Sequence, residues 1–198
     1  LSHSDKGLES AMMASNQYAR AISIMYDMVG MNANTSVDVV LNDARQLIQK
    51  YSLMDRSAGQ RYYLYHNRKP LIGIVSVGQN SAPYTISQAQ AIVDGLQEMG
   101  FSIMLGVPAY WRSANGSGDV VNDPKILDLI KDVDIIMPWF VGVYDYDGTV
   151  PTTPWGSFTK FFEKRIVDDF SAAANYGVDF CPLVFPGFSD RNMHPGHY

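Results

Sequence analysis

Short apolar runs alternate with amphipathic segments along most of the chain. The apolar runs end at glycine, proline or polar residues, which is typical of strands. They cover residues 21–26, 70–77, 101–107, 133–137 and 178–185. The segments between them repeat apolar residues every three to four positions, which predicts helices. These predicted helices cover residues 5–18, 36–48, 87–99, 123–131 and 157–176.

Connections of this length are too long for hairpins, so the pattern predicts a parallel sheet built from right-handed strand–helix–strand units. Two architectures fit this order. A doubly wound sheet usually has a Gly-rich phosphate turn after its first strand, and no predicted strand end carries GxGxxG or a P-loop. We therefore expect an α/β fold of the parallel (β/α)8 TIM-barrel type. It would be incomplete, with about five β/α units, and residues 1–198 would form one partial catalytic domain.

The composition argues against two kinds of partner, nucleic acids and membranes. The chain has 198 residues, 46% of them apolar, and a formal net charge of -5. It lacks the cluster of Lys and Arg that gives nucleic-acid-binding proteins their electrostatic footprint. Its apolar runs fall short of the roughly 18 residues that cross a bilayer, and the first residues lack the pattern of a signal peptide. The sequence predicts no nucleic-acid partner and no membrane span.

Candidate site residues follow from the architecture, because the chemistry of parallel α/β folds gathers at the carboxyl ends of the strands. Aromatic rings, an arginine and a carboxylate stand there. This combination suits sugars, whose C–H faces stack on rings while their hydroxyls need polar partners. The candidate substrate-binding residues are Tyr26, Asp27, Tyr110, Trp111, Arg112 and Trp139. We expect Asp27, Trp111, Arg112 and Trp139 to converge on one common mouth.

The same residues also have structural explanations. Tyr26, Tyr110 and Trp139 could plug the barrel mouth or pack under loops. Asp27 could cap the turn at Gly30 or form an ion pair with Arg112. Both kinds of explanation stay open for every one of these residues.

Three other motifs are too incomplete to predict a functional site. The run Asp145-Tyr146-Asp147-Gly148 starts like a calcium loop, but no bidentate Glu follows at the required place. His194 and His197 lack nearby metal ligands to join them. Cys181, the only cysteine, lies in a strand-like run and is expected to be a small core residue. We predict no metal and no cofactor.

A glycosidase ordinarily needs two carboxyl groups beside the scissile bond. The only glutamates are Glu9, Glu98 and Glu163, and each falls in a predicted helix. Helices form the outer ring of a barrel, away from its active face. If the chain belongs to a glycosidase, its acid–base pair must lie outside these residues, so the catalytic residues are unknown.

Four segments in order resemble bacterial proteins related to glycoside hydrolase families 99 and 71. These relatives are endo-α-mannosidase-like or xylosidase/arabinosidase-like proteins, and the resemblance covers nearly the whole chain. The segments are SIMYDMVGM (23–31), FSIMLGVPAYWR (101–112), DIIMPWFVGVY (134–144) and CPLVFPGFSDRNMHPG (181–196).

The resemblance implies a (β/α)8 barrel in which this chain supplies about the third to seventh strands. The family's catalytic glutamates follow the eighth strand and have no counterpart here. In the endo-α-mannosidases, the resemblance implies hydrolysis with retention, assisted by the 2-hydroxyl of the substrate. It implies a general sugar-contact role for Asp27, Tyr110, Trp111, Arg112 and Trp139. It also implies export to the periplasm or the medium.

We therefore expect part of a glycoside hydrolase that acts on an oligosaccharide or polysaccharide such as an α-mannan. The fragment alone would be inactive. The alternative is a non-catalytic carbohydrate-binding protein or a degenerate barrel. Because five strands of an eight-stranded barrel leave two sheet edges unpaired, we also expect marginal stability and a tendency to associate.

Overall fold

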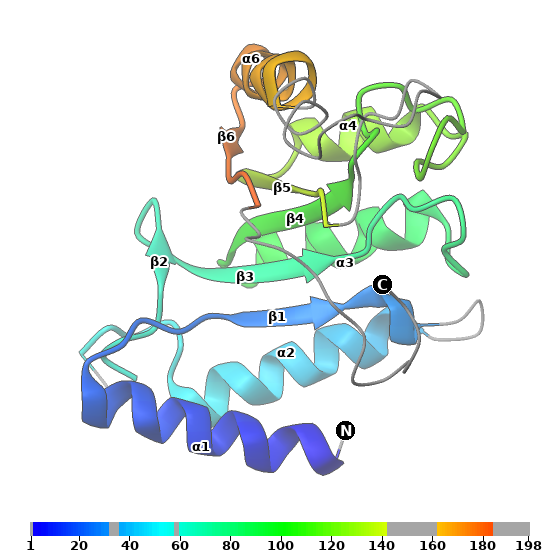
Figure 1. Ribbon diagram of the computed structural model, residues 1–198. Coiled ribbons are helices and arrows are strands. Elements are labelled where there is room, and N and C mark those ends of the chain that lie inside the picture. Colours follow the sequence, from blue (N-terminus) through cyan, green and yellow to red (C-terminus); the bar gives the residue numbers. More distant parts are fainter. Residues whose placement is uncertain (1, 32–35, 58–59, 142–161, 184–198) are drawn as a thin grey trace, which may run out of the picture.

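Strands and helices alternate along the chain in a computed structural model that describes residues 2–31, 36–57, 60–141 and 162–183 (Figure 1). The α-helices are α1 (Ser2–Tyr18), α2 (Val37–Tyr51), α3 (Ile86–Glu98), α4 (Lys125–Lys131) and α6 (Val167–Tyr176). A 3-10 turn, η1 (Met28–Gly30), follows the first strand, and a π-helical turn, η2 (Phe162–Ile166), leads into α6. The strands are β1 (Ile24–Asp27), β2 (Tyr65–His66), β3 (Lys69–Val75), β4 (Ser102–Pro108), β5 (Ile135–Trp139) and β6 (Asp179–Phe180).

The strands form one mostly parallel sheet, which confirms the predicted α/β class. The parallel strands are ordered β1-β3-β4-β5-β6, and β2 pairs antiparallel with β3. This order follows the chain and does not reverse among the described strands, whereas a doubly wound sheet reverses at its switch point. β1 and β6 are the two edge strands, so the described sheet is open and does not close into a barrel.

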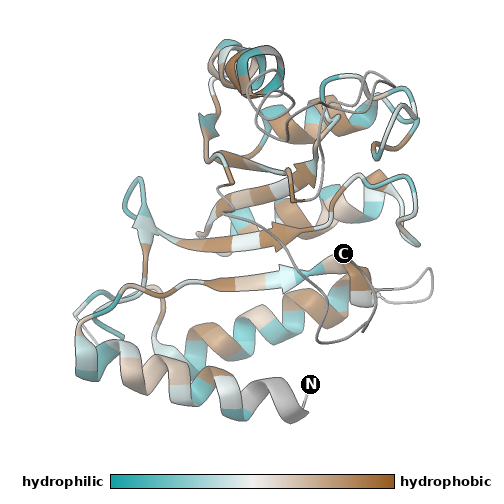
Figure 2. Ribbon diagram, viewed as in Figure 1, coloured by the Kyte–Doolittle hydropathy of each residue, from teal (hydrophilic) through white to brown (hydrophobic). Residues whose placement is uncertain are grey.

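The helices pack against one face of the sheet. α2 contacts α3 and α3 contacts α4, and in Figure 1 α3 lies behind β4 while α4 lies above β5 in the view. Strand residues on this helix-packed face belong to the main core, together with the apolar stripes of the helices. They are Ile24, Ile72, Ile74, Ile103, Leu105, Val107 and Ile136. Figure 2 shows the resulting pattern, with apolar central strands and amphipathic helices.

The opposite face carries the alternate residues of each strand. Met25 pairs with Gly73, Gly73 with Met104, and Met104 with Ile135. Since successive side chains along a strand point to opposite faces, Asp27 and Trp139 belong to this face as well. The sheet therefore separates a core shared with the helices from a second face whose carboxyl edge carries a carboxylate and an indole.

Local signals in the sequence explain where the helices begin and end. The Ser36 hydroxyl accepts a hydrogen bond from the Asp38 N–H and caps α2, as the sequence predicts. Thr85 and Gln88 form a capping box at the start of α3. Gly100 follows α3 with a φ of +99°, a conformation that favours glycine.

The β2–β3 hairpin is an element that the periodicity does not predict. Its two-residue turn consists of Asn67 and Arg68, with φ values of 47° and 67°. Positive φ at both positions is the signature of a type I′ turn, whose twist suits a hairpin.

None of the helices in the described ranges is long and apolar enough to cross a membrane.

Candidate functional site

Asp27 ends β1 at the carboxyl edge of the sheet, and its side chain is exposed. Its Oδ1 atom accepts hydrogen bonds from the Val29 N–H at 3.0 Å and from the Ser76 hydroxyl at 2.9 Å. The first bond caps η1, which confirms that Asp27 caps the turn ending at Gly30. Both bonds from described residues end on Oδ1, which restricts the orientation of the carboxylate and leaves Oδ2 without a hydrogen-bond partner among those residues.

Ser76 is held in an unusual conformation directly after β3. Its φ is 67°, in the left-handed region that L-residues rarely adopt. The buried Tyr84 hydroxyl donates a hydrogen bond to the Ser76 carbonyl oxygen, which helps to maintain this conformation. Burial, with a further contribution from the negative charge of Asp27, raises the pKa of Tyr84. Backbone strain of this kind is often found at binding sites.

Trp139 ends β5 on the opposite face of the sheet, and 45% of its surface is exposed. It pairs in register with Pro108, the last residue of β4. A half-exposed indole at the carboxyl end of a parallel strand is available for stacking against a ligand. Asp27 and Trp139 therefore share one face and one edge of the sheet, separated by β3 and β4.

Tyr26 points to the helix-packed face, as alternation along β1 requires. Its hydroxyl donates a hydrogen bond to Asp43 Oδ2 on α2 at 2.7 Å. Burial, followed by this hydrogen bond, raises the pKa of Tyr26. Tyr26 thus anchors β1 to α2 instead of facing the carboxyl-edge surface that contains Asp27.

Tyr110, Trp111 and Arg112 follow β4 and turn toward α6. Trp111 is fully buried, with its ring edge-to-face against Tyr176 at a centroid distance of 6.0 Å. Tyr110 is half-buried, and the Arg165 guanidinium lies 3.9 Å from its ring centroid. The buried ring of Trp111 offers no surface to a ligand, so its contacts are those of a core residue.

Arg112 forms ion pairs with α6. Its Nε donates a hydrogen bond to Asp169 Oδ1 at 2.5 Å, and Nη2 lies 3.7 Å from Asp168 Oδ2. Asp169 is fully buried, and its Oδ2 has no hydrogen-bond partner among the described residues. Burial raises the pKa of Asp169, and hydrogen bonding and charge from Arg112 only partly oppose this effect. The suggested pairing of Arg112 with Asp27 is wrong, because its acidic partners are on α6.

The expected common mouth is therefore only partly formed. Asp27 and Trp139 lie on one face at the carboxyl edge, but Trp111 enters the core and Arg112 turns toward α6. The substrate-binding role of all six candidates stays a prediction. Sequence reasoning missed Ser76 and Tyr84, which position Asp27, and Asp169, which holds Arg112. No motif marks these three residues, because their roles arise from contacts between distant segments.

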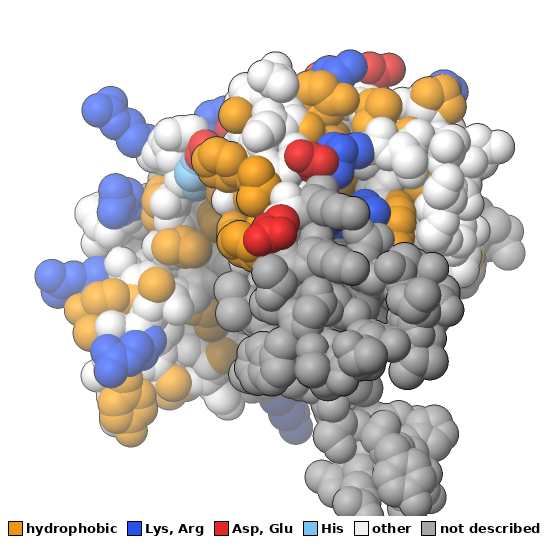
Figure 3. Space-filling view, turned by 45° about the horizontal axis from the view of Figure 1, so that its top comes forward, with side chains coloured by type: hydrophobic (Ala, Val, Ile, Leu, Met, Phe, Trp, Pro, Cys, Tyr) orange, Lys and Arg blue, Asp and Glu red, His pale blue; other side chains and the backbone are white. Residues whose placement is uncertain are grey.

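Exposed hydrophobic side chains form a second candidate surface, on α6 and the turn before it. Figure 3 shows that hydrophobic side chains are exposed among charged ones on the face that it presents. The large exposed hydrophobic residues of η2 and α6 are Phe162, Val167 and Phe170. Phe170 also packs edge-to-face on Phe180 of β6. Among the described residues, the three side chains of this surface offer no polar groups to orient a small ligand.

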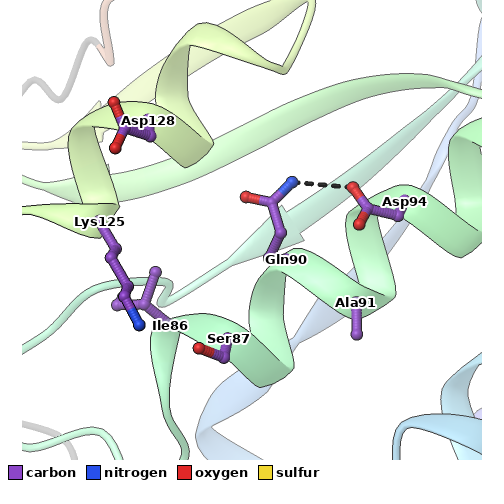
Figure 4. A pocket seen from close by; sticks show the side chains of 7 residues that line it. All are labelled: Ile86, Ser87, Gln90, Ala91, Asp94, Lys125 and Asp128. Carbon is purple, nitrogen blue, oxygen red and sulfur yellow. Dashed lines mark hydrogen bonds between the residues drawn. The ribbon is translucent and has the colours of Figure 1, made fainter.

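A groove of about 330 Å³ lies between α3 and α4 (Figure 4). Ser87 and Asp94 line it from α3, and Lys125 and Asp128 line it from α4. Gln90 donates hydrogen bonds to Asp94 within the groove and to Asp132 beyond it. Its polar groups partly satisfy one another, and it lies on the outer helical layer. We interpret it as a solvated groove between two helices.

The remaining titratable groups do not form a second centre in the described ranges. No three His, Cys, Asp or Glu side chains there are arranged to hold a metal ion. The residues 145–148, His194 and His197 lie outside the described part of the chain. Cys181 is exposed, so its predicted place in the core is wrong. Glu9, Glu98 and Glu163 lie in α1, α3 and η2, as their predicted helical positions require.

Comparison with known proteins gives no family assignment for the chain. No protein-family model matches it, and no curated protein matches it.

Proposed function

We propose that the chain is part of a (β/α)8-barrel glycoside hydrolase and contributes one wall of its sugar-binding cleft. Asp27 and Trp139 are the contact residues in this proposal. The substrate is a glycan such as an α-mannan, and the acid–base pair comes from outside these residues. One observation carries the proposal: a fixed carboxylate and a half-exposed indole lie on one face at the carboxyl edge of a parallel sheet.

The strand order supports a barrel more than a doubly wound sheet. In a barrel every strand joins the same growing edge, so the spatial order follows the chain. The order β1-β3-β4-β5-β6 has this property, and neighbouring helices pack side by side on one face. The resemblance to families 99 and 71 leads to the same architecture.

A side-chain bridge across β4 and β6 supports curling of the sheet. His66 lies 2.8 Å from Ser102 on β4 and 2.8 Å from Asp179 on β6. Neighbouring strands lie about 4.8 Å apart, so β4 and β6 are separated by roughly twice that distance. One imidazole can join them only if the side chains lean together over the opposite face. A sheet that curls toward this face produces such convergence.

Sugar recognition needs an apolar surface and oriented polar groups, and the site offers both. The Trp139 indole can stack on the C–H face of a pyranose ring. The Oδ2 atom of Asp27 can accept a hydrogen bond from a sugar hydroxyl, and carboxylates form stronger hydrogen bonds than neutral acceptors. Because Ser76 and Val29 already bind Oδ1, ordering the carboxylate costs little on binding.

Calorimetric titration with oligosaccharides of α-mannan, xylan and arabinan tests the sugar site. We expect one of these classes to bind, and Trp139→Ala or Asp27→Asn to weaken its binding about tenfold, equivalent to about 1.4 kcal/mol. Phe170→Ala is the matched control, since it removes an exposed aromatic ring from α6. Binding that is equally strong in the wild type, Trp139→Ala and Asp27→Asn would refute the proposed contacts.

An assay of the chain against aryl glycosides and α-mannan tests where the acid–base pair resides. We expect no turnover. On the opposite face of the described strands the carboxylates are Asp27 and Asp179, which lie at opposite edges of the sheet. Robust turnover would show that these residues do contain a catalytic pair, and would contradict this part of the proposal.

The same observation favours a second candidate, a protein that binds sugars without cleaving them. Asp27 is enough to orient a sugar but does not supply both an acid and a base, and the Asp119 carboxylate after β4 is bound to the Ala109 and Tyr110 N–H groups. The coding sequence on either side distinguishes the two candidates. A downstream strand followed by two glutamates supports the hydrolase, and its absence supports the binding protein.

A further inference from the structure

One histidine joins three strands at the amino edge of the sheet. His66 is the last residue of β2, Ser102 is the first of β4 and Asp179 is the first of β6. The His66 Nδ1 atom lies 2.8 Å from Ser102 Oγ, and Nε2 lies 2.8 Å from Asp179 Oδ2. The bridge thus connects the β2–β3 hairpin to two strands that are not neighbours of each other.

The chemistry of the three groups sets the direction of the hydrogen bonds. An ionised Asp179 can only accept, so Nε2 carries the hydrogen and donates it. In a neutral ring Nδ1 then accepts from the Ser102 hydroxyl, and in a protonated ring Nδ1 donates to it. The contact with Asp179 is therefore kept in both protonation states, and a positive ring adds an ion pair.

Ser102, His66 and Asp179 are the residue types of a hydrolytic triad, but the serine is not accessible to a substrate. Ser102 is fully buried, so a substrate cannot reach its hydroxyl. The three residues also lie at the amino edge of the sheet, whereas sites in parallel α/β folds form at the carboxyl edge. The geometry fits a structural role.

The strand that the bridge reaches is weakly attached to the sheet. β6 pairs with β5 over two residues, Asp179 and Phe180. The Asp179 N–H donates to the Asp134 carbonyl oxygen at 2.9 Å, and the Cys181 N–H donates to the Ile136 carbonyl oxygen at 2.8 Å. Because β6 has so few backbone hydrogen bonds to the sheet, one well-oriented side-chain hydrogen bond contributes a large share of the free energy that holds β6 in place.

We propose that His66 is a latch that keeps β6 docked on the sheet. The hairpin positions the ring, Ser102 fixes its rotation from one side, and Asp179 ties β6 to it from the other. Opening the latch frees the β6 edge while leaving β3, β4 and β5 paired. This inference does not depend on the proposed sugar site.

Amide hydrogen exchange measured by NMR tests the latch, because exchange reports local opening in each strand separately. The first variant is Asp179→Ala, which removes an exposed side chain and should leave the fold intact. We expect the amides of residues 179 and 181 to exchange about three- to tenfold faster after correction for intrinsic rates. Amides in β4, such as that of Leu105, should not change.

A second variant, His66→Phe combined with Ser102→Ala, removes the other two partners without leaving a buried hydroxyl unpaired. It should give the same acceleration at residue 181, and adding Asp179→Ala to it should give no more. Asp128→Ala is the control, since it removes the exposed ion pair with Lys131 and should leave β6 unchanged. Unchanged exchange at residue 181 in both variants, or equal acceleration in β4, would overturn the proposal.

Discussion

Asp169 is a carboxylate without exposed surface, and its charge is balanced mainly by one guanidinium. Arg112 binds one of its oxygens, while the other has no hydrogen-bond partner among the described residues. Removing one member of such a pair leaves the other charge poorly compensated, which costs more than the pair itself contributes. This contact holds α6 against the segment that follows β4.

Replacing Asp169 with Ala should lower the free energy of unfolding by about 2–4 kcal/mol. Asp168→Ala is the matched control, because Asp168 lies 3.7 Å from the same guanidinium but is largely exposed, and its loss should cost less than about 1 kcal/mol. Chemical denaturation measures both. Equal effects of the two substitutions would show that burial does not determine the strength of this ion pair.

The raised pKa of Asp169 also predicts a pH dependence. Between the ordinary carboxyl pKa of about 4 and the raised value, the folded protein keeps a proton that the unfolded chain has released. The contribution of Asp169 to stability is therefore greatest below this window and decreases as pH rises through it. Asp169→Asn should remove this contribution from the stability–pH curve, and an unchanged curve would contradict the assignment.

Buried tyrosines predict a second loss of stability at alkaline pH. Burial raises the pKa of Tyr26, Tyr63 and Tyr84 above that of a free phenol. Above pH of about 10 the unfolded chain releases phenolic protons that the folded protein retains, so stability must decrease as pH rises. Tyr84→Phe should reduce the slope of this decrease by about one proton, as measured by denaturation between about pH 9 and pH 11. The same slope in the variant would contradict the prediction.

The directions of individual side chains are what the sequence predicted least well. Tyr26 and Asp27 are adjacent, so alternation places them on opposite faces. The pattern does not say which face the helices cover, because the strands are apolar at nearly every position. The identities at the strand ends were therefore predictable, but Tyr26 and Trp111 could not be assigned to the core without knowing where α2 and α6 pack.

Among the elements, the type I′ turn of the β2–β3 hairpin is the clearest source of strain. Arg68 occupies a position where glycine is strongly preferred, at a φ of 67°. Arg68→Gly should therefore raise the free energy of unfolding by about 0.5–1 kcal/mol, since relief of strain exceeds the added entropy of the unfolded chain. Lys69→Gly is the control, because it places glycine inside β3 and should destabilise. Thermal denaturation that shows the same sign for both would contradict this account.

Gly73 and Gly106 lie on the opposite face and should differ in how well they tolerate substitution by alanine. A Cβ at position 106 would lie 2.6–3.0 Å from Val75, including its Cα, whereas one at position 73 would meet mainly the flexible side chain of Met25. Met25 is 53% exposed and can move away. Gly106→Ala should cost about 1–3 kcal/mol and Gly73→Ala clearly less, as measured by urea denaturation. The reverse order would contradict the packing of this face.

Most elements were predicted to within a few residues because their periodicity is strong and their ends carry caps or turn residues. The hairpin strand β2 is the main omission. Two residues are too few to show a period, and residues 52–69 carry no regular apolar spacing. Consequently the histidine bridge to Ser102 and Asp179 was also missed.

The parallel strands give the open sheet a carboxyl edge and an amino edge that carry different side chains. The carboxyl edge carries Asp27 and Trp139, and the amino edge is held by the His66 bridge. The binding function that we propose at the carboxyl edge and the structural role that we propose at the amino edge agree with the division found in parallel α/β folds.

NMR mapping of amide shifts during titration with the oligosaccharide that binds tests the proposed sugar site. We predict that the largest shifts gather at the carboxyl ends of β1, β3 and β5, around Asp27, Ser76 and Trp139. Shifts that gather instead on the groove between α3 and α4, around Ser87 and Lys125, would contradict it.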